Sequence, residues 1–419
     1  MAFCRIFTIF AAIYVETIHS NNKQDQKTDY LAAVAVLLPT LSFAQDEKKD
    51  EKKNVFTPVV ENAVTSVKDQ HRSGTCWAYS SLGFFESELL RMGKGEFDLC
   101  ESFLAYKTYM DRADKAVRTH GDASFSEGGS FYDAVYCLKH YGIVPQEAMP
   151  FPGSLYGDSL FNFTQMMKVA GAVVKTISSE GIKNPNPVWK KDLSSIFEHY
   201  FGELPETFEY KGKSYTPQSF VQYLGINPDD YVSLTSFNHV PFYEQFVIEV
   251  QDNWRWGLSY NLPLDEFMET MDYAVRNGYT FAWGADVSER GFNSATATVT
   301  VPDTKVESKE GSDAVRWTGD NGKGEPQKKS IKELEITQEL RQQGYDNWET
   351  TDDHGMIIYG IAKDENGKEW YMMKNSWGAR GPHDGFWYVS KPFVAYKTIN
   401  ILLHKDAVPK DIKRKLGIK

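Results

Sequence analysis

The stretch "QHRSGTCWAYSS", residues 70–81, places a cysteine where a helix is expected to begin. Apolar residues recur at helical intervals after Cys76, and Gly93 ends that pattern. The N-terminus of a helix favours a thiolate, because its unpaired N–H groups and its dipole present positive potential. Gly74 would let a substrate backbone approach the sulfur, and Gln70 could direct a side-chain N–H at an oxyanion. The spacing therefore predicts a nucleophilic thiol.

A thiol nucleophile needs a base, and His354 is the strongest candidate among nine histidines. It opens the strand-like segment "HGMIIYGIAKD", which turns at Asn366-Gly367 into "KEWYMMKNSWG". A two-residue hairpin turn pairs residues whose numbers sum to about 733, which puts His354 opposite a position near 379. A bulge or a longer turn would bring it closer to Asn375. Asn375 is then expected to orient the His354 ring, and Trp377 to shield their hydrogen bond from water.

The other histidines and cysteines are weaker candidates. His71 lies in the same loop as Cys76 and is poorly held for proton transfer, and His383 lies in the turn "ARGPHDG" without an orienting partner in the sequence. Cys100 and Cys137 lie in segments with helical spacing and are predicted to be small buried apolar residues. The sequence contains no CxxC, HExxH or EF-hand pattern, so we predict no metal site and no cofactor.

The composition of the chain and the order of its predicted helices and strands indicate its fold class. With 41% hydrophobic residues, the chain can form a packed core, and a net charge of −11 argues against nucleic acid as a partner. Helical patterns dominate up to about residue 275, and strand patterns separated by turn signals follow. We predict an α+β domain over 56–419, with a helical lobe at about 70–275, a β lobe at about 276–405 and an exposed polar insertion at about 303–329.

The N-terminal region resembles an export signal. The apolar run "YLAAVAVLLPTLSFAQ" ends in Ser42-Phe43-Ala44, which suits cleavage after Ala44 and a secreted or periplasmic protein without a stable membrane anchor. A charged linker follows at 45–55, too short for a self-inhibiting propeptide. The earlier apolar run "CRIFTIFAAIYV" is unusual for one signal, and a start assigned about 20 residues too far upstream would explain it. Export leaves three cysteines, an odd number, so at least one thiol stays free or pairs between chains.

Three motifs together resemble the papain-like cysteine peptidases: "Q-x-x-S-G-x-C-W", "H-G-M" at the head of a strand, and "K-N-S-W-G". The wider chain is similar to the bleomycin hydrolase and aminopeptidase C branch of that family. Segments such as "YTPQSFVQYLG", "SYNLPLDEF" and "VPKDI" follow the order of that branch, and the resemblance extends over about 56–415.

The resemblance implies a two-lobed fold with a cleft, a peptide substrate, and Cys76 as nucleophile. It implies His354 as general acid and base, Asn375 as its orienting partner, and an oxyanion hole made by Gln70 with the Cys76 backbone N–H. It also implies that Gly128-Gly129 holds an extended substrate, and that the branch assembles as hexamers. An aminopeptidase is thus the first expectation.

The C-terminal tail departs from that branch. The branch places its C-terminus in the cleft, whereas this chain stops soon after "VPKDI" with a basic ending. A short tail could leave the cleft open for an endopeptidase, or Lys419 could still reach it. Two further alternatives remain at this stage: a Cys-His acyl or amine transferase, and a non-catalytic protein that keeps a peptide-binding groove.

Overall fold

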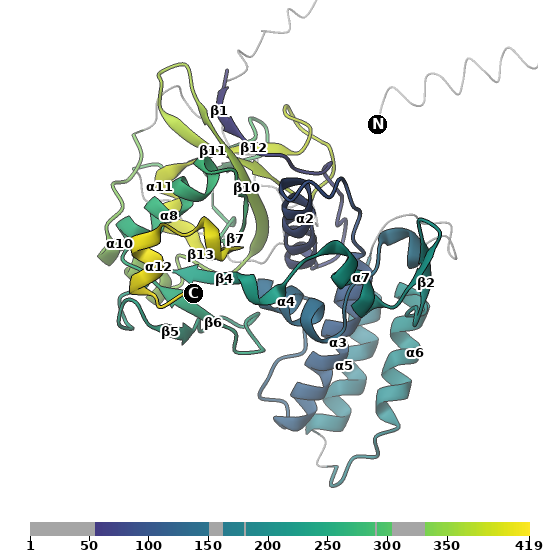
Figure 1. The fold of residues 1–419 in the computed structure, drawn as a ribbon. Coiled ribbons are helices and arrows are strands. Elements are labelled where there is room, and N and C mark those ends of the chain that lie inside the picture. Colours follow the sequence, from purple (N-terminus) through teal and green to yellow (C-terminus); the bar gives the residue numbers. More distant parts are fainter. Residues whose placement is uncertain (1–54, 151–161, 180–181, 290, 304–331) are drawn as a thin grey trace, which may run out of the picture. The chain divides into compact units, whose positions relative to one another are not determined.

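The computed structural model describes residues 55–150, 162–179, 182–289, 291–303 and 332–419 (Figure 1). The predicted signal segment 1–44, the linker up to residue 54 and nearly all of the predicted insertion at 303–329 lie outside the described residues. Those three expectations therefore stay predictions.

The helices begin and end close to the signals in the sequence. Cys76 is the first residue of α2, and α7 begins after Thr216, whose side chain accepts a hydrogen bond from the Ser219 N–H. Gly225 ends α7 in the left-handed conformation, which favours glycine. The helices are α2 (Cys76–Arg91), α3 (Glu101–Arg118), α4 (Phe131–His140), α5 (Thr164–Ser179), α6 (Trp189–Phe201), α7 (Pro217–Leu224), α8 (Leu264–Arg276), α10 (Gln338–Asp346), α11 (Lys391–Lys397) and α12 (Lys410–Lys415).

Most strands join one large sheet, in the order β5-β6-β4-β13-β7-β10-β11-β12-β9-β8, with β1 paired to β10. Neighbours are antiparallel except for β4 with β6 and β12 with β9. A separate hairpin pairs β2 with β3. The strands are β1 (Thr57–Glu61), β2 (Phe208–Tyr210), β3 (Lys213–Tyr215), β4 (Tyr231–Thr235), β5 (Gln245–Val247), β6 (Leu258–Asn261), β7 (Phe281–Ala285), β8 (Phe292–Asn293), β9 (Thr298–Val299), β10 (His354–Lys363), β11 (Glu369–Lys374), β12 (Phe386–Ser390) and β13 (Thr398–His404).

The two large hydrophobic cores of the described residues define two lobes, and the central strands separate them. Side chains alternate across a strand, so successive residues of β10 face different cores. Ile357 joins the helical core, whereas Met356 and Ile358 join the core on the other face of the sheet. Strands β7 and β13 alternate in the same way. The helical core takes most of its residues from α2 to α7, and the second core is covered by α8, α11 and α12 (Figure 1).

The lobe boundary differs from the expectation at residue 275. Strands β4, β5 and β6 lie within 231–261, a range that the sequence assigned to the helical lobe, yet they extend the sheet beyond β13. These strands are only three to five residues long, and so short a run carries little periodicity. The α+β class itself agrees with the structure.

The β10–β11 hairpin contains both a longer turn and a bulge. Lys363 pairs with Glu369, and the Asp364 N–H donates to the Lys368 carbonyl at 3.0 Å, so the turn has three residues instead of the expected two. A register shift between Ile358 and Gly360 follows along the strand. Both features bring the end of β11 closer to His354. The sequence predicted this effect of a bulge or of a longer turn.

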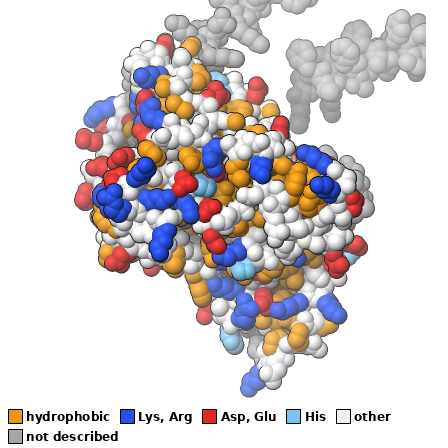
Figure 2. Space-filling view, in the orientation of Figure 1, with side chains coloured by type: hydrophobic (Ala, Val, Ile, Leu, Met, Phe, Trp, Pro, Cys, Tyr) orange, Lys and Arg blue, Asp and Glu red, His pale blue; other side chains and the backbone are white. Residues whose placement is uncertain are grey.

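Acidic and basic side chains are interspersed on the face drawn in Figure 2. Ion pairs of the sheet lobe such as Arg276–Glu369 and Lys415–Glu266, both at 2.7 Å, fit that distribution. Within the described part of the chain, none of the helices has both the length and the apolar character that a membrane span requires.

Candidate active site

Cys76 occupies the first position of α2, as predicted, and lines a cavity of about 420 Å³. The backbone N–H groups of Ala78 and Tyr79 both donate to the Thr75 carbonyl, which closes the first turn beneath the sulfur. Cys76 is 8% exposed, and its thiol lies at the positive end of the helix, where a thiolate is favoured.

The other two described cysteines have a different environment. Cys100 and Cys137 are buried, as the sequence predicted, and neither forms a disulfide with another described cysteine. Burial raises the pKa of the Cys100 thiol to about 12 and also raises that of Cys137, because an apolar interior disfavours the thiolate. Of the three, only Cys76 borders the cavity.

His354 and Asn375 meet as the sequence predicted. The His354 Nε2 lies 2.8 Å from the Asn375 Oδ1, and both residues are buried. The Trp377 ring covers the His354 ring with centroids 4.7 Å apart, so water has little access to that bond. His354 opens β10 opposite Ala285 of β7 and lines the same cavity as Cys76. A bond at Nε2 leaves the Nδ1 edge of the ring for proton transfer.

A glycine brings the two lobes together at this point. A Cβ on Gly355 would lie 2.4 Å from the Ser80 Oγ and 3.3 Å from the Trp77 Cα, so β10 packs directly on the first turns of α2. This close approach places His354 against the part of the helix that carries Cys76. The rival histidines lie elsewhere: His71 is 4.0 Å from Asp69, and the His383 ring packs on Tyr388.

Gln70 is buried and held on three sides. Its Nε2 donates to the Ser73 carbonyl at 2.8 Å, its Oε1 accepts from the Ser376 Oγ at 2.6 Å, and its backbone N–H donates to the Ser376 carbonyl. These bonds link the loop before Cys76 to the residue after Asn375. Ser73 and Ser376 stand within the quoted motifs, but the sequence assigned them no role.

Gly74 and Gly129 both make room for neighbouring side chains. The Gly74 N–H donates to the Glu127 Oε2 at 2.6 Å, and a Cβ on Gly74 would lie 2.8 Å from the Glu127 Cβ. A Cβ on Gly129 would meet the Trp77 ring at 2.7 Å, and Gly129 lines the cavity. Gly74 is absent from the described lining, so its observed contact is with Glu127.

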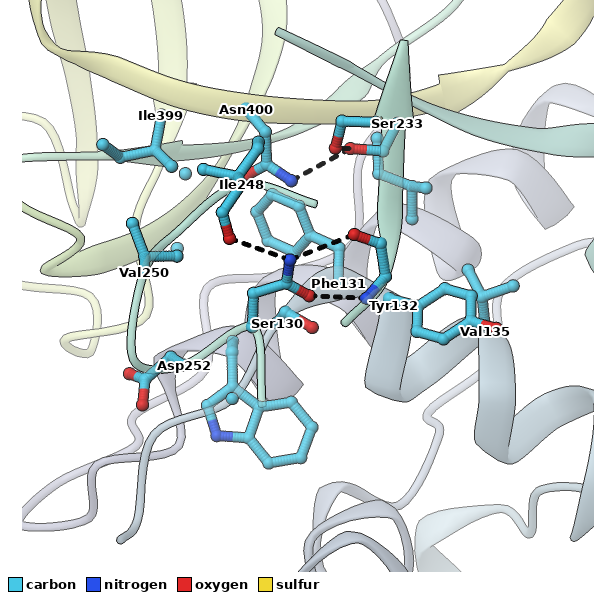
Figure 3. Close-up of a pocket in the computed structure, with 18 of the residues that line it drawn as sticks. Ser130, Phe131, Tyr132, Val135, Ser233, Ile248, Val250, Asp252, Ile399 and Asn400 are labelled. Carbon is cyan, nitrogen blue, oxygen red and sulfur yellow. Dashed lines mark hydrogen bonds between the residues drawn. The ribbon is translucent and has the colours of Figure 1, made fainter. Parts of the chain in front are cut away.

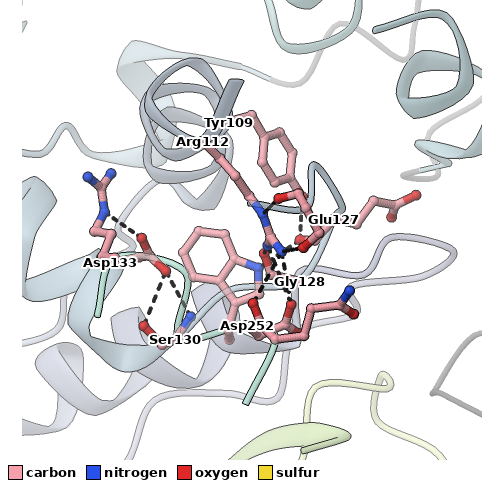
Figure 4. Close-up of polar contacts among 11 residues, drawn as sticks. Tyr109, Arg112, Glu127, Gly128, Ser130, Asp133 and Asp252 are labelled. Atoms are coloured by element: carbon pink, nitrogen blue, oxygen red, sulfur yellow. Dashed lines mark hydrogen bonds and ion pairs between the residues drawn. The ribbon is translucent and has the colours of Figure 1, made fainter. Parts of the chain in front are cut away.

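Gly128 lies between Arg112 and Asp252 (Figure 4). The Arg112 Nη1 donates to the Gly128 carbonyl at 2.6 Å, and a Cβ on Gly128 would stand only 1.9 Å from the Asp252 Oδ2. Sequence reasoning missed Arg112, Glu127 and Asp252, because single charged residues far apart in the chain form no local pattern.

The cavity is lined by apolar side chains, by uncharged polar side chains and by a set of carboxylates. Figure 3 shows Ile399 and Asn400 on one side and Ser130 and Asp252 on the other. The described lining includes four aspartates and neither lysine nor arginine. The four are Asp229, Asp252, Asp352 and Asp353.

A comparison with protein families identifies the family of this chain. The model of the Peptidase C1-like family matches residues 12–305 and 332–418, which is most of the chain. The chain belongs to the Peptidase C1-like family.

This family member is similar to several bacterial aminopeptidases. It is 23% identical to aminopeptidase G of Lactobacillus delbrueckii subsp. lactis, over 94% of this chain and 92% of that one. It is 22% identical to aminopeptidase C of Streptococcus thermophilus, over 86% and 85%. The crystal structure of PepW from Lactobacillus rhamnosis HN001 aligns with a TM-score of 0.61 at 17% identity, over 86% and 84%.

These findings confirm the predicted resemblance and the papain-like, two-lobed α+β fold. The protein is a cysteine-type peptidase of the Peptidase C1-like family, in the branch of the aminopeptidases C and bleomycin hydrolase.

The C-terminal residues of this Peptidase C1-like protein pack on the sheet lobe. Leu416 is buried in the second core, Ile418 packs against it, and Lys415 pairs with Glu266 of α8. The described residues that line the cavity end at Leu402. The tail segment 410–419 therefore contacts α8 and its surroundings, outside that lining.

Proposed function

We propose that this protein is a cysteine aminopeptidase that removes N-terminal residues from peptides through a thioester intermediate. The observation that carries the proposal is that Cys76, at the start of α2, and His354 line one cavity, and that the His354 Nε2 lies 2.8 Å from the Asn375 Oδ1. The relatives named aminopeptidase, which align over most of both chains, support the exopeptidase assignment.

The proposed reaction begins with the Cys76 thiolate and the His354 imidazolium. The sulfur attacks the carbonyl carbon of the scissile bond, and the oxygen takes the electron pair. The Cys76 backbone N–H and the Gln70 side chain stabilise that oxyanion. As the C–N bond breaks, His354 donates its proton to the leaving amine nitrogen, which leaves a thioester on Cys76.

Water completes the cycle. His354, now neutral, accepts a proton from the water that attacks the thioester carbonyl. The C–S bond breaks, the acid product leaves, and the thiolate and imidazolium are restored. Asn375 keeps the ring in one orientation through both half-reactions, because its amide oxygen accepts only from a protonated Nε2.

The test uses the purified full chain and its Cys76→Ala variant. Each receives a peptide with a free N-terminus and the same peptide N-acetylated, and mass spectrometry follows the fragments. We expect stepwise loss of single residues from the free peptide only, and no cleavage by Cys76→Ala. Internal cuts in both peptides would show an endopeptidase, and transfer of the acyl group to an added amine without hydrolysis would show a transferase.

We also propose that the protein is exported, on the strength of the apolar run that ends at Ala44. The measurement is the N-terminal sequence of the protein recovered from culture fractions. A chain that starts at Gln45 outside the cytoplasm supports export, and an intact leader on a cytoplasmic chain contradicts it.

A further inference from the structure

We propose that Asp252 binds the α-ammonium group of the substrate and closes the cavity beyond the substrate's first residue. This inference rests on the proposed function, because it names the group that would make the peptidase recognise a free N-terminus. It concerns the specificity of the reaction and leaves the Cys76 and His354 chemistry unchanged.

Asp252 stands on a loop whose shape is fixed by its neighbour. The Asn253 side chain donates from Nδ2 to the carbonyls of Ile248 and Gly257, each at 3.0 Å, and its Oδ1 accepts from the Gly257 N–H at 2.8 Å. Asn253 is buried, so these bonds hold the loop from 248 to 257 against the cavity (Figure 3). The Asp252 carboxylate is therefore presented at a defined place, 27% exposed.

That place is directly over Gly128. With an Asp252 oxygen 1.9 Å from where a Cβ would stand, a larger residue at position 128 would displace the carboxylate. The Gly128 carbonyl is already bound by the buried Arg112 at 2.6 Å. A peptide lying along the glycine pair can thus use Gly129, which lines the cavity, but meets the Asp252 side chain at Gly128.

The described lining of the cavity offers carboxylates to an ammonium group and contains neither lysine nor arginine. Arg112, outside that lining, binds the Ser124 and Gly128 carbonyls at 2.8 and 2.6 Å, and both of its Nη atoms form a longer ion pair with one Asp252 oxygen at 3.4 Å. A carboxylate that meets an ammonium group in a partly enclosed cavity forms a charge-assisted hydrogen bond.

The other aspartates of the lining are less suited to the role. Asp229 pairs with Lys139 at 2.5 Å, and Asp353 accepts hydrogen bonds from Thr351 Oγ1 at 2.9 Å and from the Ser288 N–H at 3.2 Å. Asp352 lines the same cavity, but none of its atoms is among the three nearest to a Cβ added at Gly128 or Gly129. Asp352→Asn is therefore the matched control for charge.

The experiment compares wild type, Asp252→Asn and Asp352→Asn on alanyl and N-acetylalanyl aminomethylcoumarin amides. We expect Asp252→Asn to lower kcat/KM for the alanyl substrate about 10- to 100-fold, the size of one charge-assisted hydrogen bond. The N-acetylated substrate should be cleaved equally or faster by this variant. Asp352→Asn should keep the wild-type ratio of the two substrates within about twofold.

A measurement on the wild type separates the effect of the substrate's ammonium charge from the effect of its size. The propionyl amide has the shape of the alanyl substrate without its ammonium group, and we expect wild type to lose about 10- to 100-fold on it. Equal cleavage of propionyl and alanyl substrates by wild type would overturn the Asp252 assignment even if Asp252→Asn failed to fold.

Three further outcomes show whether the bound ammonium is the α-amino group or a side chain, and which of the two proposals fails. If Asp252 bound a basic side chain, Asp252→Asn would slow lysyl and N-acetyllysyl substrates and spare the alanyl one, which would overturn the α-ammonium assignment. Wild type that cleaves acetylated and free substrates equally would overturn the aminopeptidase proposal itself. A selective wild type with an unchanged Asp252→Asn ratio would overturn the role of Asp252 alone.

Discussion

The His354 Nε2 and the Asn375 Oδ1 lie 2.8 Å apart across the end of a hairpin, 21 positions apart in the chain. The same Asn375 oxygen accepts a hydrogen bond from the Ser376 N–H at 2.8 Å. The amide is thus held by its own backbone while it holds the imidazole, and the ring orientation depends on a short, stiff segment after β11.

Asn375→Ala should reduce activity far more than stability. Without its acceptor the His354 ring can rotate, and we expect kcat to fall by about 10² to 10⁴, as for other orienting groups of this type. Asn375→Asp retains an acceptor and should recover part of that loss. Steady-state kinetics on both variants, beside thermal melts, checks this. Full activity in Asn375→Ala would remove the orienting role.

The contact between β10 and α2 depends on Gly355. Gly355→Ala puts a methyl group 2.4 Å from the Ser80 Oγ and 3.3 Å from the Trp77 Cα, and should cost about 1 to 3 kcal/mol of unfolding free energy as the strand moves away from the helix. The same shift separates His354 from Cys76, so kcat should fall with it.

Gly171→Ala is the matched control for that substitution. Gly171 lies within α5, where the nearest atom to an added Cβ is 3.9 Å away. Alanine favours a helix over glycine by about 1 kcal/mol, so this variant should be at least as stable as wild type. Urea unfolding of both variants measures the difference, and similar losses in the two would contradict the packing argument.

Loss of the Lys374 proton should raise the free energy of unfolding as the pH rises above about 8. Burial lowers its pKa to about 8, and its Nζ donates to the Thr65 Oγ1 at 2.8 Å. Below pH 8 both states hold the proton and the cost of a buried charge is constant. Between pH 8 and the unfolded value near 10.4, only the unfolded chain keeps the proton, so this group adds about 1 kcal/mol of stability per pH unit.

The measurement is urea unfolding at pH 7, 8, 9 and 10. Lys374→Met should lack this increment, while Lys363→Met, at an exposed position of β10, should follow wild type. Parallel curves for wild type and Lys374→Met would show that the buried amine does not titrate in this range.

Thiol reactivity should differ among the described cysteines. Iodoacetamide at pH 7.5 is expected to modify Cys76 in the folded protein and to spare Cys100 and Cys137, whose pKa values burial raises. Peptide mapping by mass spectrometry locates the label. In urea all three should react, and early labelling of Cys100 or Cys137 in the folded chain would contradict the burial argument.

The sequence by itself determined the local parts of the site. The helix start at Cys76, the strand head at His354 and the hairpin that leads to Asn375 all follow from short-range patterns, because a helix start, a strand and a turn depend on residues near one another. The burial of Cys100 and Cys137 followed from the same helical spacing.

Only the tertiary structure decided how distant segments meet. The three-residue turn and the bulge in the β10–β11 hairpin, the strands β4 to β6 in the sheet, and the contact of Gly355 with Ser80 depend on packing between elements. The position of Asp252 over Gly128 depends on a loop and a buried arginine from separate parts of the chain. Such contacts form only when the lobes pack, and the free energy that selects them comes from that packing, so no local pattern records them.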